Sequence, residues 1–528
     1  MTGPMIPKGA SYERLTPAFR MGNLMTIGYT LGIDIGTFES KGVIVDDHGQ
    51  IIAQAACPHK MIVPRPGWAE HRAEQDWWGD FTHLAKTLLA ASKVDPKSIR
   101  AIATSAIGPC MLPVDAAATP LMNGVLYGVD TRATAEIALL NSQIGEDSIL
   151  ARCGNALTSQ SVGPKILWLR RNRPEIWAKT AKILTSTSFL VHRLTGQMVI
   201  DHHTAASFSP LYDSDAQDWC ADLAGICAPD QLPRLLWSTD IAGTITTAAA
   251  QETGLATGTP VTCGTIDAAA EAVSIGVRDI GDMMMMYGST IFIIQITDHR
   301  LSDTRLWQTP WLYPGQYSAM AGLATSGTLT HWMRDQCARD LPPDSAFATL
   351  TAEADGSPPG AKGLICLPYF SGERTPIHDP NAKGAFFGLN LTHTRGDLYR
   401  AAIEGIAAAT RHITDTYASA GATPRRVLAV GGGTKNRPWL QATSDMTGLD
   451  QTLCKVVTGA SFGNAFLASV AIGQSRPADI SHWNPAAETI HATHHAAYAR
   501  QYPLFRRLYE ATKDIAADLS AADLSAAD

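Results

Sequence analysis

The sequence predicts a large α/β protein made of two similar halves. Of its 528 residues, 45% are hydrophobic and only 17% are charged, which is typical of a globular enzyme rather than of a disordered or fibrous chain. An apolar strand, a small-residue turn and a second apolar strand occur near residue 27 and again near residue 283. A chain of this length has room for two large domains. The repeat therefore indicates that a second copy of one fold begins near residue 281.

The first half begins with three strands and no helix between them. Apolar runs at 27–35, 41–45 and 51–56 are separated by a Gly36-Thr37 turn and by residues 46–49, which are typical of a hairpin. A dinucleotide-binding fold would place a helix directly after its first glycine turn. The order of strands therefore argues against that fold.

Further strands and helices follow in both halves. The pattern predicts a helix that contains Trp77 and Trp78, and later a strand that leads into a helix at Ile266. The other predicted strands are 102–105, 260–264, 283–287, 291–296 and 426–430, and the other predicted helices are 165–172, 189–194 and one that begins at Gly463.

The charge and the cysteines of the chain restrict its partners and its compartment. A net charge of −7 and a pI near 6.1 give no positive field for a polyanion, so nucleic acid and anionic membranes are poor partners. The most apolar stretch, 283–296, is shorter than the roughly 20 residues that cross a bilayer. Nine cysteines without a Cys-x-x-Cys pair fit neither a zinc site nor a disulfide framework. We therefore expect a cytoplasmic protein with no nucleic-acid or membrane partner.

The first glycine turn carries the residue types that phosphate binding needs. Asp34 ends the first strand, Gly36 and Thr37 form the turn, and Lys41 follows in the second strand. Glycine lets backbone N–H groups approach phosphate oxygens, the hydroxyl adds a donor and the ammonium meets the charge. Asp34 could hold Mg²⁺ through water. The alternative is an ordinary hairpin in which Asp and Gly are only turn residues.

Asp267 follows a predicted buried strand and opens a helix. A carboxylate at this point can cap the helix or face a cleft as a general base. Two more small-residue turns follow strong strands, at 288–290 and at 431–433. Each could be ordinary turn chemistry, but such turns in two similar halves indicate a nucleotide clamped between domains.

Six segments, in register from residue 31 to about 475, carry a family resemblance. In chain order the six are Gly32 to Lys41; Pro66 to Glu70 with Trp77-Trp78; Pro164 to Trp168 with Pro174 to Trp177; Gly264 to Ala269; Ser371 to Pro376 with Asp379 to Gly384; and Gly431 to Gly433 with Asn436, Trp439 and Gln441. The run Ser371-Gly372-Glu373-Arg374-Thr375-Pro376 is the most specific of these segments. With these segments the chain resembles the FGGY family of carbohydrate kinases and, within it, xylulokinase-like members.

The resemblance implies a fold and a reaction. It implies two ribonuclease H and actin-like (ASKHA) domains with the active site in the cleft between them. It also implies transfer of the γ-phosphoryl group of ATP, with Mg²⁺, to a hydroxyl of a small sugar or polyol such as a ketopentose. A homodimer is a frequent assembly in such families. Phosphoryl transfer depends on positioning and charge neutralisation, which the residue types above can supply.

The same resemblance assigns roles to individual residues. Asp267 matches the general base, and Asp34 matches the carboxylate near the metal. The positions matched to ATP are Gly36, Thr37 and Lys41 in the first phosphate loop, Gly288, Ser289 and Thr290 in the second, and Gly432, Gly433 and Asn436 at the adenosine end.

Two polar contacts of xylulokinases are missing from this sequence. Gly108 and Pro109 occupy the substrate-facing place of a Met-His pair and offer no side-chain donor, and Ala268 replaces an Asn or Gln after the base. A site without these contacts is not expected to bind the same sugar. Asp130 and Arg132 are the candidates to replace them. For the pair His202-His203 a solvated loop is the preferred interpretation.

The expected division of the chain is an extension at 1–27, a sugar-binding domain at 28–280, a nucleotide-binding domain at 281–505 and a low-complexity tail at 506–528.

Three other functions are alternatives to a sugar kinase. An actin-like or Hsp70-like ATPase would share the paired turns but would not need the segments at 66–70 and 371–376. A non-catalytic ATP- or sugar-binding regulator would gain nothing from a base, and a glycosidase would not need phosphate turns. The sequence therefore predicts a sugar or polyol kinase.

Overall fold

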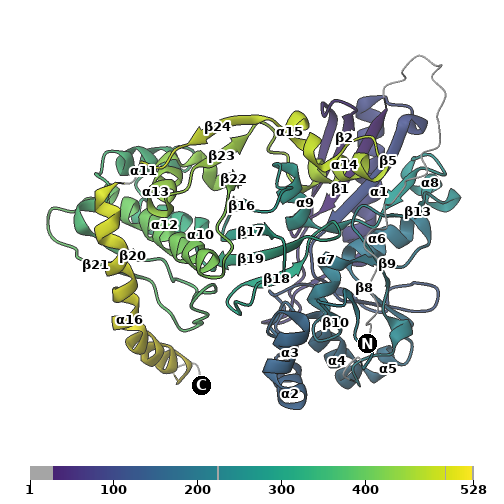
Figure 1. Ribbon diagram of the computed structural model, residues 1–528, viewed down its shortest axis with the longest axis horizontal. Coiled ribbons are helices and arrows are strands. Elements are labelled where there is room, and N and C mark those ends of the chain that lie inside the picture. The colour runs from purple at the N-terminus through teal and green to yellow at the C-terminus, as the bar shows by residue number, and fades with distance from the viewer. Residues whose placement is uncertain (1–27, 223–224, 494, 526–528) are drawn as a thin grey trace, which may run out of the picture.

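The computed structural model describes residues 28–222, 225–493 and 495–525, and the extension expected at 1–27 lies outside them. Two seven-stranded sheets form the centres of two domains (Figure 1). The strands of the first sheet lie between residues 29 and 266, and those of the second between residues 282 and 490. The two-domain α/β architecture predicted from the sequence is confirmed.

The first sheet contains three antiparallel strands followed by two parallel ones. Strand β1 pairs antiparallel with β2, and β2 pairs antiparallel with β3. On its other side β1 runs parallel to β5, which in turn runs parallel to β14. The strands of this sheet are β1 (Tyr29–Ile35), β2 (Glu39–Asp46), β3 (Ile51–Pro58), β5 (Ile99–Ala106), β13 (Ile241–Thr244), β14 (Pro260–Thr262) and β15 (Thr265–Ile266).

The second sheet repeats this topology. Strands β16, β17, β19, β22 and β23 take the places of β1, β2, β3, β5 and β14, with the same directions. This is the ribonuclease H and actin-like arrangement, so the internal repeat and the expected fold are both confirmed. Its strands are β16 (Asp282–Tyr287), β17 (Ile291–Thr297), β18 (Trp307–Pro310), β19 (Tyr317–Leu323), β22 (Arg426–Val430), β23 (Gln451–Cys454) and β24 (Ala486–Ile490).

Helices and short strand pairs complete both domains. The helices before the second sheet are α1 (Asp80–Ser92), α2 (Thr134–Ile144), α3 (Glu146–Cys153), α4 (Val162–Asn172), α5 (Pro174–Trp177), α6 (Ser186–Thr195), α7 (His202–Ala205), α8 (Thr247–Thr253) and α9 (Asp267–Ser274). Those after its first strands are α10 (Gly327–Cys337), α11 (Ala346–Asp355), α12 (Arg395–Ser419), α13 (Arg437–Thr447), α14 (Ala460–Ala471), α15 (Ile480–Trp483) and α16 (Ala496–Ser525). The two-stranded pairs are β4 (Glu70–His71) with β7 (Gly124–Val125), β6 (Leu112–Val114) with β8 (Lys182–Leu184), β9 (Val199–Asp201) with β12 (Arg234–Leu236), β10 (Tyr212–Asp213) with β11 (Asp218–Trp219), and β20 (Ile365–Leu367) with β21 (Ala385–Phe387).

The burial of each strand follows from what covers it. Strands β1 and β5 are buried along nearly their whole length, and both read as continuous apolar or small-residue runs. Strand β3 instead alternates between half-buried and exposed residues because it lies at the edge of the sheet. Helix α1 packs on β2 and β3, and α14 packs on β1 and β5. A helix from the last fifth of the chain thus covers the first sheet (Figure 1).

Two glycines allow α14 to approach the first domain closely. A Cβ atom on Gly463 would lie 1.9 Å from the carbonyl oxygen of Ala270 in α9, and one on Gly32 would lie 2.0 Å from the carbonyl oxygen of Ser461. Backbone therefore meets backbone at both places, with no flexible side chain that could move aside. This contact fixes α9, whose first residue is Asp267.

We expect Gly463→Ala to lower the free energy of unfolding by about 1–3 kcal/mol, the usual cost of forcing extra atoms into a packed core. In a helix interior the same change normally stabilises by up to about 1 kcal/mol, so a loss would have to come from the contact with Ala270. Denaturant unfolding measures it. Gly79→Ala is the control, because a Cβ at Gly79 meets no atom closer than 3.4 Å. An unchanged or raised stability of Gly463→Ala would contradict the close packing.

The structure contradicts the solvated loop expected for His202 and His203. They begin the short helix α7, and His203 is almost fully buried. Its Nδ1 lies 3.0 Å from the carbonyl oxygen of Pro310, on the edge strand of the second sheet. The Nδ1 of His202 lies 2.9 Å from the hydroxyl oxygen of Tyr212. The loop interpretation failed because His203 is covered by β18, which is more than 100 residues away in sequence.

Helix α16 continues through residue 506, where the low-complexity tail was expected to begin. The hydroxyl of Tyr509 donates to Asp379 Oδ2 at 2.9 Å, and Ala516 is buried. The helix therefore packs on the segment that follows the Ser371–Pro376 run. No helix among the described residues is long and apolar enough to cross a bilayer.

Candidate active site

Three carboxylates lie together at the carboxyl end of the first sheet. Asp34 stands near the end of β1, Asp267 begins α9, and Glu271 follows one turn later. Burial, and after it the charge of Asp34, raises the pKa of Asp267 to about 8 and that of Glu271 to about 7. Burial also raises the pKa of Asp34 to about 6. Like charges with little water around them form a site that a cation would stabilise.

A hydrogen bond from β5 fixes the orientation of Asp34, and a second bond, from α14, holds the donor in place. The hydroxyl of Ser105, its register partner on β5, donates to Asp34 Oδ1 at 2.6 Å. The Nδ2 of Asn464 on α14 donates to Ser105 Oγ at 2.7 Å and to the carbonyl oxygen of Ile33 at 2.9 Å. The close approach of α14 thus brings a buried amide to the serine that holds the carboxylate predicted to lie near the metal.

Asp267 is not the cap of its helix. Ile266 occupies the N-cap position of α9, and Asp267 is the first residue inside the helix. Its Oδ1 accepts a hydrogen bond from the amide of Ala268 at 2.8 Å, and the residue keeps part of its surface exposed. Of the two interpretations of this carboxylate, the arrangement favours the one in which it faces a cleft.

The first glycine turn lies beside these carboxylates. The amide of Gly36 donates to the carbonyl oxygen of Glu39 at 3.2 Å, which closes the turn between β1 and β2. Lys41 forms an ion pair with Glu39 at 3.1 Å, and both side chains are about half exposed. The charge of Lys41 also lowers the pKa of Asp34 and that of Glu271. The structure therefore brings Asp34, Gly36, Thr37 and Lys41 together near Asp267.

The other two glycine turns meet around a cavity of about 750 Å³ in the C-terminal domain. Gly288, Ser289, Gly432, Gly433 and Asn436 all line it, whereas Thr290 does not. Its volume is within the range of pockets that bind small molecules. Four of the five line it from two turns far apart in sequence, but both turns belong to the C-terminal domain, so the cavity itself does not test whether a nucleotide is clamped between domains.

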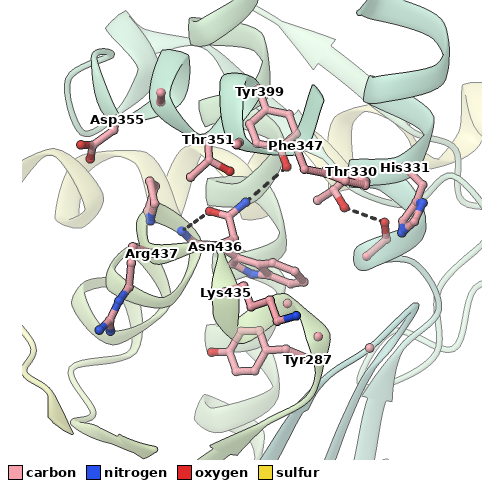
Figure 2. A pocket seen from close by; sticks show the side chains of 18 of the residues that line it. Tyr287, Thr330, His331, Phe347, Thr351, Asp355, Tyr399, Lys435, Asn436 and Arg437 are labelled. Atoms are coloured by element: carbon pink, nitrogen blue, oxygen red, sulfur yellow. Dashed lines mark hydrogen bonds between the residues drawn. The ribbon is translucent and has the colours of Figure 1, made fainter. Parts of the chain in front are cut away.

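Asn436 links two helices that line this cavity, α12 and α13, as Figure 2 shows. Its Nδ2 donates to the hydroxyl of Tyr399 on α12 at 3.2 Å, and its Oδ1 accepts from the amide of Trp439 at 3.2 Å. Five wall residues come from helices α10 and α11, which carried no signal in the sequence: Thr330, His331, Phe347, Thr351 and Asp355.

Gly108 lies against the residue that precedes the candidate base. A Cβ on Gly108 would lie 2.3 Å from Cγ2 of Ile266. Neither Gly108 nor Pro109 after it carries a side-chain hydrogen-bond donor. The missing side-chain donors inferred from the sequence are missing from the structure as well.

The structure does not bring Asp130 and Arg132 to the cleft. Both side chains are 0% exposed, and they pair with each other at 2.7 Å. Asp130 Oδ2 also accepts from the amide of Ala69 at 2.7 Å, while Arg132 bonds Glu70 at 2.8 Å and stacks over Trp68. Asp130 and Arg132 thus bond mainly each other inside the protein, and the Arg132 nitrogen without a hydrogen-bond partner, Nη1, is buried. The expectation that they replace the missing contacts is therefore not supported.

Three residues near Asp267 were not predicted as site residues. Glu271 shares its helix face, four positions on, which is a spacing that could have indicated it. Tyr127 lies where Thr37, Asp267 and Arg374 all influence its pKa, which burial raises. Arg374 comes from the other domain and donates to the carbonyl oxygen of Leu323 at 2.9 Å. Its run was recognised for family membership, but sequence alone did not show that it reaches Tyr127.

Comparison with known proteins assigns this fold and site to a class. The FGGY family of carbohydrate kinases is matched by its N-terminal domain model over residues 29–274 and by its C-terminal domain model over residues 283–472. The chain belongs to this family and is an ATP-dependent sugar kinase. A non-catalytic actin-like or Hsp70-like role is not favoured.

Relatives that match most of this chain are named for more than one substrate. A xylulose kinase of Escherichia coli (strain K12) is 29% identical over 495 residues, which are 91% of this chain and 98% of that protein. A protein named glycerol kinase 2 of Streptomyces avermitilis is 27% identical over 507 residues, with 91% and 96% covered. The solved xylulose kinase of Rhodospirillum rubrum has a TM-score of 0.87 at 30% identity, covering 92% of this chain and 99% of that one. Similarity alone therefore does not identify the substrate of this chain, which depends on its own site residues.

Proposed function

We propose that this kinase phosphorylates a terminal hydroxyl of a ketopentose, or of a pentitol or tetritol of similar size, with Asp267 as general base. The observation that carries the proposal is the position of Asp267, partly exposed at the start of α9 beside Asp34 and the first phosphate turn. An ionised Asp267 can accept the proton of the attacking hydroxyl as that oxygen bonds to the γ-phosphorus. Its raised pKa makes it a stronger base than an ordinary aspartate.

ATP is proposed to bind across the two domains. The adenosine end would lie in the cavity at Gly432, Gly433 and Asn436, and the amides near Ser289 and Thr290 would meet phosphate oxygens. The turn at Gly36 and Thr37 would contact the transferring group from the other side. Lys41 would then exchange its ion pair with Glu39 for phosphate, which its half-exposed position permits.

Mg²⁺ fits the carboxylates that would hold it. Burial, and after it the charge of Asp34, raises the pKa of both Asp267 and Glu271, which is the effect of negative charge that the protein does not fully neutralise. No three His, Cys, Asp or Glu side chains within 28–222, 225–493 and 495–525 form a group that could hold a metal ion. We therefore propose that Asp34 holds the ion through water. When bound, Mg²⁺ would neutralise negative charge on the phosphate groups of ATP.

The sugar subsite is proposed to have one apolar wall and one polar wall. Ile266, Gly108 and Pro109 form the apolar wall beside the base. Tyr127 and Arg374 are proposed to supply the hydrogen bonds that Asp130 and Arg132 were expected to give. A sugar hydroxyl against the apolar wall would be desolvated without a partner, so substrates without a hydroxyl at that place are favoured.

A substrate panel tests the proposal. ADP release is measured by a coupled assay, with Mg²⁺ and saturating ATP, for pentuloses, tetruloses, pentitols, tetritols and glycerol. Phosphorus NMR of the product identifies the hydroxyl that is phosphorylated. We expect one four- or five-carbon compound to give kcat/KM at least about tenfold above the rest, the usual effect of one well-placed or missing polar contact. Preference for glycerol would refute the proposed substrate class.

The proposal includes a homodimer in a reducing cytoplasm. All nine cysteines are free thiols in the structure, as such a compartment would leave them. Light scattering on the purified chain tests the dimer, and a monomer at assay concentration would contradict it.

A further inference from the structure

Two histidines contact backbone carbonyl groups of the Gly36-Thr37 turn, which is the proposed first phosphate turn. Nε2 of His59 lies 3.0 Å from the carbonyl oxygen of Gly36, and Nε2 of His71 lies 3.1 Å from that of Thr37. Their rings meet edge to face at 4.9 Å. In a trans peptide the N–H points opposite to the C=O. The amides of Thr37 and Phe38 therefore point away from the histidines, toward the side on which a phosphate would bind.

The hydrogen-bond partners of His71 define where its proton lies. Nε1–H of Trp77 donates to Nδ1 of His71 at 3.2 Å, and an indole nitrogen can only donate. Nδ1 must therefore carry a lone pair, and the ring hydrogen is on Nε2, from which it is donated to Thr37. Burial lowers the pKa of His71 to about 4, in agreement with a ring that stays neutral.

The partners of His59 require the opposite state. Its Nδ1 lies 2.8 Å from Asp80 Oδ2, and its Nε2 faces the carbonyl oxygen of Gly36. Both partners are acceptors, so only the doubly protonated imidazolium can donate to both. The hydroxyl of Ser40 also donates to Asp80 Oδ2, at 2.7 Å, which holds the carboxylate in place. The side chains of His59 and Asp80 are only 6% and 11% exposed, so little water can replace a lost bond.

We propose that the His59–Asp80 ion pair, together with neutral His71, positions the phosphate turn, and that loss of the His59 proton releases Gly36 and weakens ATP binding. His59 and Asp80 are positioning residues, because they act through the turn and touch no substrate. The inference rests on the proposed function, in which Gly36 and Thr37 bind phosphate. It adds a proton-dependent support that the family assignment does not include.

The charged groups around His59 give the direction of the pH effect. Burial lowers its pKa, but the bond and charge of Asp80 on α1, the carbonyl of Gly36 and the charge of Asp76 together raise it above the ordinary value. His71 on β4 also faces it, as an uncharged ring, and Cys57 on β3 shares Asp80. Because the pKa of the folded state is raised, both bonds of His59 are present at low pH. One of them is lost as the pH rises through that pKa.

Steady-state kinetics across pH test the proposal at saturating sugar. For the wild type we expect KM for ATP to be constant on the acidic side and to rise by about tenfold above the pKa of His59, roughly the effect of one lost hydrogen bond to a charged group. kcat should change less. Asp80→Asn removes the negative partner, so the rise in KM should move to lower pH. His59→Gln should raise KM for ATP at every pH and remove the rise. His83→Gln is the control, because His83 is exposed and lies on α1, the helix that carries Asp80.

A second measurement separates this inference from the proposed function. Carbon-13 labelling of histidine Cε1 follows the protonation of His59 by NMR, with His59→Gln to assign its signal, and calorimetry follows ADP affinity without any sugar. If no sugar in the panel is phosphorylated, the proposed function fails, while the His59 titration and its downward shift in Asp80→Asn still test the ion pair. A neutral His59 ring at pH 6, or a pH profile unmoved in a folded Asp80→Asn, would overturn the inference.

Discussion

Replacement of Asp267 by asparagine is expected to lower kcat by about 10²- to 10⁴-fold, the usual contribution of a general base. Asparagine has the same shape and can still accept the amide of Ala268, but it cannot take the proton of the sugar hydroxyl. KM for ATP should change little, because the cavity proposed to bind adenosine lies in the other domain. The coupled assay with the preferred sugar measures both constants.

The stability of the same variant gives an independent check. The pKa of Asp267 is about 8 in the folded protein and near 4 in the unfolded chain. A carboxyl group with a raised pKa in the folded state destabilises the fold once the pH exceeds its unfolded pKa. Asp267→Asn should therefore raise the melting temperature at pH 8 while activity falls. Asp298→Asn, at an exposed carboxylate paired with His299, serves as the control and should change neither. A variant that is both less stable and less active would indicate a structural role instead.

The repeat of strand, turn and strand made most of the fold predictable. Buried strands such as β1 and β16 read as continuous apolar runs, and the Gly36-Thr37 turn and the hairpin at 46–49 appeared where expected. The sequence could not show that α14 covers the first sheet, because that contact joins residues more than 400 positions apart. It depends on close backbone approach at Gly32 and Gly463, and a glycine in a sequence does not reveal its neighbour.

The site was predictable where local sequence dictates chemistry. Asp34 lies near the end of a strand and Asp267 follows one, and the structure brings them together. The role of Asp130 was not predictable, because its sequence position resembles that of a substrate-facing acid while its partners, Ala69 and Arg132, satisfy it internally. His59 carried no signal at all. Its proposed positioning role depends on Asp80 and Gly36, which the fold brings to the two nitrogens of the His59 ring.

Replacement of Asp34 by asparagine is expected to have two separable effects. The first is a loss of kcat of about 10²- to 10³-fold, comparable to that of removing one preorganised group that stabilises charge in a transition state. The hydrogen bond from Ser105 at 2.6 Å can be kept by the amide oxygen, so the fold should survive. The Mg²⁺ concentration required for half-maximal rate should rise, since the proposed water-mediated support of the ion is lost.

The second effect is on the pH dependence of the remaining activity. After burial, the charge of Asp34 is the largest influence that raises the pKa of Asp267 to about 8. A general base works when ionised, so at limiting Mg²⁺ the wild-type kcat/KM for the sugar should rise with pH up to about 8. Without the neighbouring charge the pKa of Asp267 falls, and the acidic limb of Asp34→Asn should move to lower pH. Added Mg²⁺ should shift the wild-type limb in the same direction, because a cation favours the ionised carboxylate. If the limb stays in place in both experiments, Asp34 and Asp267 are not coupled, and the assignment of the two carboxylates to one reaction fails.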